Sequence, residues 1–266
     1  MLGRFLSRIL LLLCMNMGFA NIGYSKDIAI NFIANGSVRI TDGEQILFTD
    51  FPYVSGAYGQ MTYTYPFFVE QDNDVTTLIT HRLNDSFDPA AFMNLKWKII
   101  APSEVIGDLQ ARYKASNDAR NEVIAVLEKD HEIAQALSPD SEVPLVLPAP
   151  VIKPNIIPFS STIKNGAMTI TPIKTAFAGA EHYSYLVQWS GRTIYFSGDT
   201  GDTDHLAALP ELDIAFLTPW LHENARRANA LPNAKKIVIY QHKDNEIIPN
   251  CTGCVIPIQG GYVSFD

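Results

Sequence analysis

The chain is poor in cysteine and in basic residues, and it lacks any run of positive charge. Its 266 residues include 3 cysteines, and 20 Lys and Arg stand against 28 Asp and Glu, a formal net charge of −8. Without a basic patch the protein is a poor match for nucleic acid or anionic lipid, whose phosphates attract Lys and Arg. No G-x-S-x-G sequence is present, so a serine nucleophile at a strand–helix turn has no support.

The first 20 residues have the pattern of a secretory signal peptide. Arg4 and Arg8 give a positive start, residues 9–17 are mostly apolar, and Gly18-Phe19-Ala20 is a small-x-small cleavage site. Its removal takes away Cys14 and two basic residues, which leaves 18 basic against 28 acidic residues, or −10. We predict a periplasmic or secreted protein with one domain over residues 21–266. We expect a small-molecule substrate or ligand, no nucleic acid, and no membrane partner after cleavage.

Alternation of apolar and polar residues predicts a chain rich in strands. A helix is predicted over 119–137, where apolar residues recur at helical spacing, and six prolines between Pro139 and Pro158 predict a stiff, extended connection. Two strand-rich halves favour two sheets packed face to face with helices outside, an α/β sandwich. The expected strands are 28–34, 37–40, 46–49, 75–79 and 97–100, then 168–173, 183–189, 193–196, 212–217 and 236–240.

Polar side chains follow three of these strands. His81 and Asp85 come after 75–79, Asp199 follows 193–196, and Gln241-His242 follows 236–240. The ends of strands in stacked sheets can converge on one edge, and histidine with two carboxylates suits a divalent metal. Spacing alone is weak evidence, because a single histidine after a strand is more often a hydrogen-bonded loop residue.

Four segments, in this order, resemble the metallo-β-lactamase superfamily, especially its lactonase-like, metal-dependent hydrolase branch. ANGSVRITDGEQILFTDFPY (34–53) resembles the opening hairpin and LITHRLNDSFDP (78–89) the T-H-x-H-x-D-H loop. EHYSYLVQWSGRTIYFSGDT (181–200) resembles the strand pair that ends in a metal-bridging aspartate, and KKIVIYQH (235–242) the strand before the last histidine. The resemblance implies a four-layered αββα sandwich and a hydrolase whose two metals share one aspartate.

Carried over by position, the resemblance assigns the metal ligands to His81, Asp85, Asp199 and His242. Asp199 would be the bridge, and Gln241 competes with His242 for the last position because the register there is open. Catalytic roles fall on His81 and Asp85, with His81 orienting the substrate or acting as general base. Asp50 would support the site from behind, or simply form a turn.

Three histidines of the family pattern are missing, with Leu83, Ser86 and Phe177 in their places. The first metal site keeps two protein ligands, whereas a catalytic zinc normally keeps three. The second site keeps three, so we expect at most one divalent ion (Zn, Mn or Fe) on the Asp85/Asp199/His242 side, or none. Leu83 and Phe177 would fill the space that the first metal leaves.

The leading functional hypothesis is an exported hydrolase-like protein with a reduced metal centre and weak or altered hydrolysis. The alternative is a non-catalytic periplasmic binding protein that uses the former active-site cleft. Cys251-Thr252-Gly253-Cys254 predicts a structural disulfide in an exported protein, and a thiol-redox role is the least favoured reading.

The remaining histidines and aromatics have plainer interpretations. We expect a structural role for His182 and surface positions for His205 and His222. The aromatic residues of 51–53 and 61–65 either line a substrate groove or pack beneath a loop, and the sequence favours neither.

Overall fold

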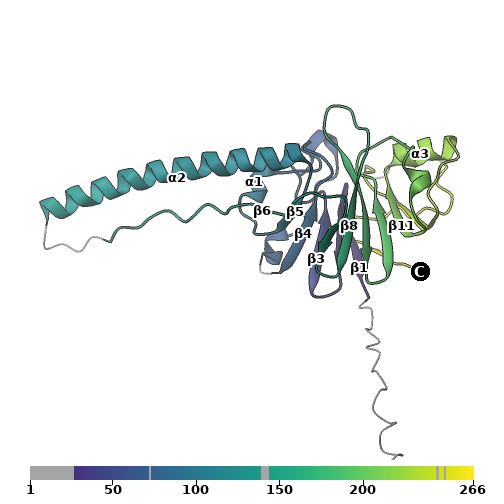
Figure 1. Cartoon of the computed structure of the whole chain (residues 1–266), viewed down its shortest axis with the longest axis horizontal. Helices are drawn as coiled ribbons and strands as arrows, with labels where there is room; N and C mark the ends of the chain where they lie inside the picture. The colour runs from purple at the N-terminus through teal and green to yellow at the C-terminus, as the bar shows by residue number, and fades with distance from the viewer. Residues whose placement is uncertain (1–26, 72, 139–143, 244–245, 249) are drawn as a thin grey trace, which may run out of the picture.

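The computed structural model describes residues 27–71, 73–138, 144–243, 246–248 and 250–266, so the predicted signal peptide and Cys14 lie outside the described residues. Two sheets form the body, and a long helix projects from it (Figure 1). The first sheet has the strand order β13-β1-β2-β3-β4-β5-β6 and the second β12-β11-β10-β9-β8-β7.

The first sheet contains most of the N-terminal half of the described chain and one C-terminal strand. Its antiparallel hairpins at one side give way to parallel pairing from β3 onwards. Its strands are β1 (Ala29–Ala34), β2 (Ser37–Thr41), β3 (Gln45–Thr49), β4 (Asp74–Leu78), β5 (Lys98–Ile100), β6 (Asn155–Ile156) and β13 (Tyr262–Val263).

The second sheet is antiparallel from β7 to β10 and parallel from β10 to β12. Its strands are β7 (Ile163–Asn165), β8 (Met168–Lys174), β9 (Tyr183–Trp189), β10 (Arg192–Phe196), β11 (Leu212–Leu217) and β12 (Ala234–Ile239). The helices are α1 (Pro89–Phe92), α2 (Ser103–Leu137) and α3 (Pro219–Arg227), with short 3-10 turns η1 (Ala57–Gly59), η2 (Phe67–Glu70) and η3 (Leu206–Ala208).

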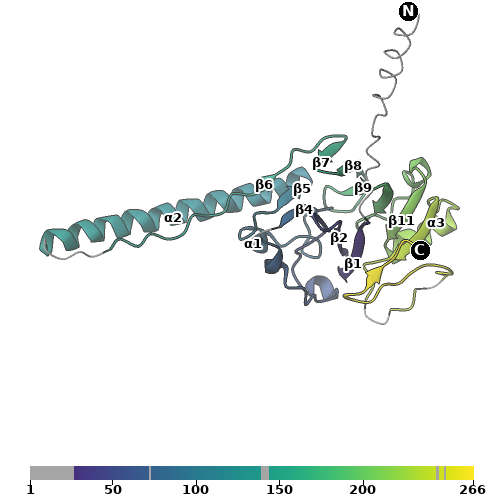
Figure 2. The same cartoon turned by 90° about the horizontal axis from the view of Figure 1, so that it is seen from below.

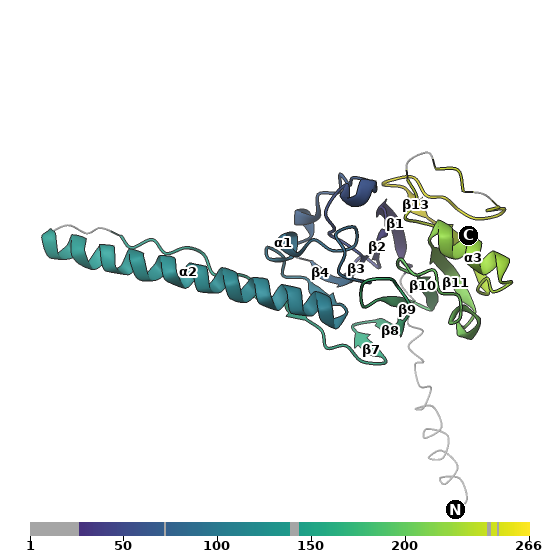
Figure 3. The same cartoon turned by 90° about the horizontal axis from the view of Figure 1, so that it is seen from above.

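One buried core joins the two sheets, and a smaller one lies under α3. Leu47 of the first sheet and Val187 of the second are both fully buried in the main core. Leu221 and Ala225 of α3 belong to a second cluster with Leu217 of β11, so α3 covers the outer face of the second sheet (Figure 3). Burying such a leucine contributes roughly 1.5–3 kcal/mol. The predicted α/β sandwich with helices outside is confirmed, although its helical layers are thin.

Aromatic side chains cover the other face of the first sheet. Phe51 and Tyr53 are fully buried, and the ring of Tyr63 lies 4.9 Å from that of Phe51 and 5.0 Å from that of Tyr53. The Trp97 ring stacks on Phe48 at 5.1 Å. Of the two interpretations that the sequence leaves open, packing beneath a loop therefore describes residues 51–53 and Tyr63.

Helix α2 projects from the body, and a returning segment runs back along it (Figures 1 and 2). It begins at Ser103 rather than at Ala119, and its 35 residues span about 50 Å. Its buried residues are Val105 and Leu109, whereas Val123 is 50% and Leu137 79% exposed. The apolar spacing thus predicted the helix correctly but not its burial.

The described part of the proline-rich return segment, residues 144–158, is extended, as predicted. Arg120 on α2 donates hydrogen bonds to the carbonyl oxygens of Pro148 and Ala149, at 2.9–3.2 Å, and β6 then joins the edge of the first sheet. Within the described residues, no helix combines the length and the apolar character needed to cross a membrane.

Candidate metal centre

His81 lies at the carboxyl end of β4, where the two sheets meet. The backbone just before it is tied to the second sheet, because Tyr183 N–H donates to the Thr80 carbonyl at 3.0 Å and the Tyr185 hydroxyl to the Ile79 carbonyl at 2.8 Å. The His81 side chain is completely buried. The end of β4 therefore delivers an imidazole into the space between the sheets.

A chain of hydrogen bonds orients the His81 ring. The Thr80 hydroxyl lies 2.9 Å from His81 Nδ1 and within 2.8–3.0 Å of both Asp50 carboxylate oxygens, and Thr80 N–H donates to Asp50 at 2.7 Å. When Asp50 is ionised it can only accept, so the Thr80 hydroxyl donates to Asp50 and accepts from His81 Nδ1–H. That tautomer leaves the lone pair on His81 Nε2, the nitrogen that faces the site.

Two carboxylates face this nitrogen. His81 Nε2 lies 3.9 Å from Asp85 Oδ1 and 3.7 Å from Asp199 Oδ2, and the three ligand atoms lie within 4.8 Å of one another. These distances are too long for hydrogen bonds. Two ligands at about 2.1 Å from one ion can be up to about 4.2 Å apart, so both measured separations allow a shared ion.

Asp199 is fixed by the loop that follows β10. Its backbone N–H donates to His182 Nε2 at 2.9 Å, and His182 Nδ1 lies 2.7 Å from the Thr175 hydroxyl. Gly198 has a φ of +59°, and a Cβ there would lie 2.5 Å from His182 Nε2, so glycine is needed for both reasons. Since its Nε2 accepts a hydrogen bond from the backbone, His182 positions Asp199 rather than facing the site.

Gln241, and not His242, is the residue after β12 that reaches this cluster. The Gln241 side-chain amide donates a hydrogen bond to the Asp199 carboxylate. His242 instead stacks on Phe32 at 5.9 Å, with Nε2 3.1 Å from the Pro257 carbonyl. Gln241 has a φ of +53°, which breaks the alternation of the strand. The structure therefore brings His81, Asp85 and Asp199 together and places the predicted ligand His242 apart from them.

Buried polar atoms without hydrogen-bond partners are concentrated here. Among the described residues they include His81 Nε2, Asp85 Oδ1, the Ser86 hydroxyl, Asn35 Oδ1 and Gln241 Oε1. Each such group costs about 1–3 kcal/mol unless an ion or water satisfies it. One imidazole nitrogen with carboxylate and amide oxygens is a donor set that suits Zn, Mn or Fe. The residues present therefore fit one divalent ion.

Burial shifts the ionisation of the whole group. It raises the pKa of Asp85 to about 6, and the negative charge of Asp199 adds to this shift. It also raises the pKa of Asp199 to about 6, although the hydrogen bond from Gln241 opposes the shift. Burial lowers the pKa of His81 to about 4, against the pull of Asp85. It also raises that of Asp50, although the Thr80 hydrogen bonds oppose the change. Near neutral pH Asp85 and Asp199 are therefore mostly ionised and the His81 imidazole is neutral, a charge balance that a cation would offset.

The three residues that replace family histidines lie in or next to this site. The Phe177 ring is 4.8 Å from that of His81 and 5.3 Å from that of His182, so it occupies the space beside His81, as expected. Ser86 is fully buried, and Leu83 is half-buried in the same turn. Direct packing of Leu83 against Phe177 stays a prediction.

Sequence reasoning missed the roles of Thr80 and His222. Thr80 directly precedes the candidate ligand His81, and this adjacency was the signal in the sequence. The position of its hydroxyl between Asp50 and His81 is visible in the structure alone. His222 is buried rather than on the surface, because α3 presses it against the loop of Cys251 and Cys254. His205 is half-buried, with its ring hydrogen-bonded to the Tyr195 hydroxyl.

No family model and no curated protein matches the chain. Among solved structures it is similar to the metallo-β-lactamase fold protein YhfI from Bacillus subtilis, at 12% identity and a TM-score of 0.55, over 90% of this chain and 100% of that one.

Two further structures are similar over nearly their whole length. One is a metallo hydrolase from the hyperthermophilic archaeon Ignicoccus hospitalis, with 13% identity, a TM-score of 0.53, and coverage of 89% and 97% of the two chains. The other is an isothiocyanate hydrolase from Delia radicum gut bacteria, with 14% identity, a TM-score of 0.52, and coverage of 89% and 98%. The chain has the metallo-β-lactamase fold, as its sequence predicted.

Proposed function

We propose that the protein is a hydrolase-like enzyme with a single divalent metal held by His81, Asp85 and Asp199. The observation that carries this proposal is the unpaired His81 Nε2, buried and facing two carboxylates at 3.7 and 3.9 Å. A buried imidazole nitrogen and a buried carboxylate oxygen without partners, beside a second buried carboxylate, are costly unless a cation joins them. This ligand set replaces the Asp85/Asp199/His242 set expected from the sequence.

The chemistry follows from one ion and its surroundings. When bound, a divalent ion lowers the pKa of a water molecule and polarises a substrate carbonyl. With Asp85 Oδ1 holding the ion, the second oxygen of the same carboxylate would be the acceptor for a proton of that water. The Thr80–Asp50 pair keeps His81 in the correct tautomer, and Gln241 holds the Asp199 carboxylate in place.

The surface beside Phe177 suggests the class of substrate. A shallow depression of about 690 Å³ is lined by Ala176, Phe177 and Gly201 together with the acidic residues Asp202 and Asp204. The acidic residues of this depression repel anions, so an uncharged substrate such as a simple ester or lactone fits better than a phosphodiester. Weak or altered hydrolysis is expected, because Leu83, Ser86 and Phe177 stand where the resemblance places histidine ligands, so a second metal ion would have too few ligands.

A second candidate function is a non-catalytic binding protein that uses the depression beside Phe177. The Phe177 ring beside His81 favours it, because an apolar ring at this place takes up space that a second ion and its water would need. In that case the depression beside Phe177 would bind a small molecule without transforming it.

Export remains part of the proposal. It is supported by the Arg4/Arg8 start and the small-x-small site at Gly18-Phe19-Ala20, and by a disulfide between Cys251 and Cys254, which is typical of oxidising compartments. N-terminal sequencing of the folded protein from a periplasmic fraction tests it. Cleavage near Ala20 is expected, and an intact Met1 would contradict it.

The experiment that tests the function compares metal-free and metal-reloaded protein. Chelator-treated protein is reloaded with Zn, Mn or Fe(II) and assayed on a panel of simple esters and lactones. Metal-dependent turnover in the wild type, lost in Asp85→Asn but kept in His242→Ala, supports the hydrolase. Metal binding without turnover on any substrate would favour the binding protein.

A further inference from the structure

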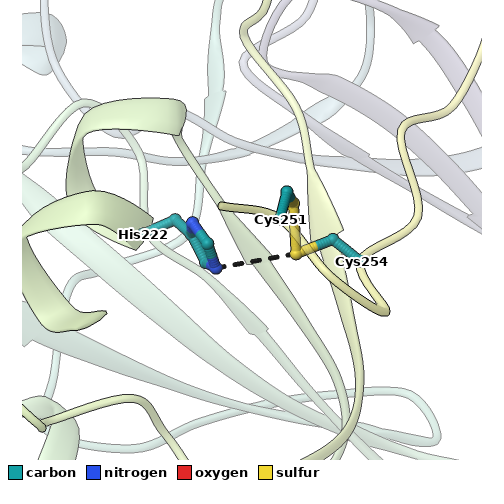
Figure 4. Close-up of side chains that lie close together, drawn as sticks. All are labelled: His222, Cys251 and Cys254. Carbon is teal, nitrogen blue, oxygen red and sulfur yellow. Dashed lines mark hydrogen bonds between the residues drawn. A yellow bond between two sulfur atoms is a disulfide. The ribbon is translucent and has the colours of Figure 1, made fainter. Parts of the chain in front are cut away.

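A second cluster of metal-ligating side chains lies beneath α3, away from His81. Cys251 and Cys254 form a disulfide across a turn in which Cys254 N–H donates to the Cys251 carbonyl at 3.3 Å and Gly253 has a φ of +81°. His222 projects from α3 towards this pair, and its Nε2 lies 3.6 Å from Cys254 Sγ (Figure 4). The His222 nitrogen and the two sulfur atoms lie within 4.8 Å of one another.

His222 has an environment that structural packing alone does not explain. Its side chain is 3% exposed, and among the described residues its Nδ1 has no hydrogen-bond partner. Among the residues that the structure describes, the other ring nitrogen has the sulfur of Cys254 as its partner, which is a weak one. Burying an imidazole in this way costs free energy unless the ring nitrogen serves another purpose. A buried imidazole whose Nε2 faces a Cys-x-x-Cys pair, and whose Nδ1 has no partner among the described residues, has the donor arrangement of an incomplete metal site.

We propose that Cys251, Cys254 and His222 bind a thiophilic metal ion, Zn²⁺ or Cu⁺, when the disulfide is reduced. The Cys-x-x-Cys spacing lets both thiolates chelate one ion, and thiolate with imidazole is the soft donor set that these ions prefer. Three protein ligands leave a fourth position for water or an added ligand. This site shares no ligand with the His81/Asp85/Asp199 cluster.

The site is gated by the redox state of the two cysteines. A dithiol reductant supplies two electrons and two protons, so that the S–S bond breaks, two thiols form, and the reductant becomes a disulfide. Metal binding then displaces one proton from each thiol. In the disulfide form neither sulfur is a thiolate, and the ion is not held.

Zinc binding to oxidised and reduced protein tests the proposal directly. The measurement is a titration against a chromophoric zinc chelator in the Asp199→Asn background, which removes the other candidate site from the count. The reduced protein should bind one equivalent of zinc that the oxidised protein does not. Repeating the titration with Cu⁺ and a Cu⁺ chelator, without oxygen, identifies which ion binds more tightly.

Variants and a spectroscopic probe separate this site from adventitious binding. His222→Ala and Cys254→Ser should each weaken the added site by about tenfold or more, whereas His131→Ala on α2 should not change it. Co²⁺ bound to the reduced protein should show a thiolate charge-transfer band, a readout that needs no variant. Equal zinc or Cu⁺ binding by oxidised and reduced protein, an unchanged affinity in His222→Ala, or Co²⁺ without that band would overturn the proposal.

Discussion

The side-chain amide of Gln241 donates a hydrogen bond to the carboxylate of Asp199. This contact brings Gln241, rather than the predicted ligand His242, to the cluster, and it fixes one of the two carboxylates that face His81. Gly36 leaves room for it, since a Cβ there would lie 2.9 Å from Gln241 Nε2. The geometry of Asp199 thus depends on a residue that does not itself need to touch the ion.

Replacing Gln241 should therefore weaken metal binding without removing it. Gln241→Ala frees the Asp199 carboxylate to rotate, and loss of such a supporting hydrogen bond typically costs about 10–100-fold in metal affinity. Competitive titration of zinc against a chelator measures the change. An affinity equal to that of the wild type would show that Gln241 does not orient Asp199.

Thr80 should be needed for the tautomer of His81 and for the stability of buried Asp50. Thr80→Val keeps the shape but removes the hydroxyl between them, so metal affinity should fall and the free energy of unfolding should drop by about 1–3 kcal/mol. Thr80→Ser restores the hydroxyl and should recover both. Chelator titration measures the metal affinity and chemical denaturation measures the free energy of unfolding. Equal values for the valine and serine variants would show that the Thr80 hydroxyl is not needed.

Metal affinity should be constant above about pH 7 and fall as the pH drops through 6. The reason is that Asp85 and Asp199, each with a pKa of about 6 in the metal-free protein, take up protons that compete with the ion. The pKa of His81, about 4, keeps that ring unprotonated over this range. Metal-affinity titrations from pH 8 to 4 check this. A fall in affinity centred near pH 4 would mean that the pKa values of Asp85 and Asp199 are not raised.

Restoring the missing histidines should rebuild a second site. Leu83→His, Ser86→His and Phe177→His together return the ligands of the family pattern, and Phe177 already lies beside His81. The metal content should rise towards two equivalents, and ester or lactone hydrolysis should increase if the supporting residues remain in place. Elemental analysis and rate measurements test this. A triple variant that folds but still binds one equivalent would show that these positions do not converge.

The sequence predicted the sheets well because apolar alternation directly reflects which strand face is buried. It placed the β9 strand at Tyr183–Trp189, as observed, and the end of α2 at Leu137. The start of α2 was missed although its two buried residues, Val105 and Leu109, lie there, whereas the apolar stripe over 119–137 that gave the prediction is largely exposed. Burial of a helix face cannot be read from spacing when the face has no partner in the described chain.

The site was predicted in part, and the error has a local cause. His81, Asp85 and Asp199 each follow a strand, and strand order brings them together. The choice between Gln241 and His242 depended on alternation beyond the end of β12. The left-handed backbone at Gln241 (φ +53°) interrupts that alternation, and no residue pattern in KKIVIYQH indicates it.

Metal content of the oxidised protein tests the central claim most directly. With the disulfide intact, elemental analysis should find one equivalent of divalent metal in the wild type and in His242→Ala, but none in His81→Ala or Asp199→Ala. His242→Ala is the matched control, since His242 is a buried histidine that stacks on Phe32 outside the cluster. Metal that is retained in His81→Ala and lost in His242→Ala would contradict the assignment, as would two tightly bound equivalents in the wild type.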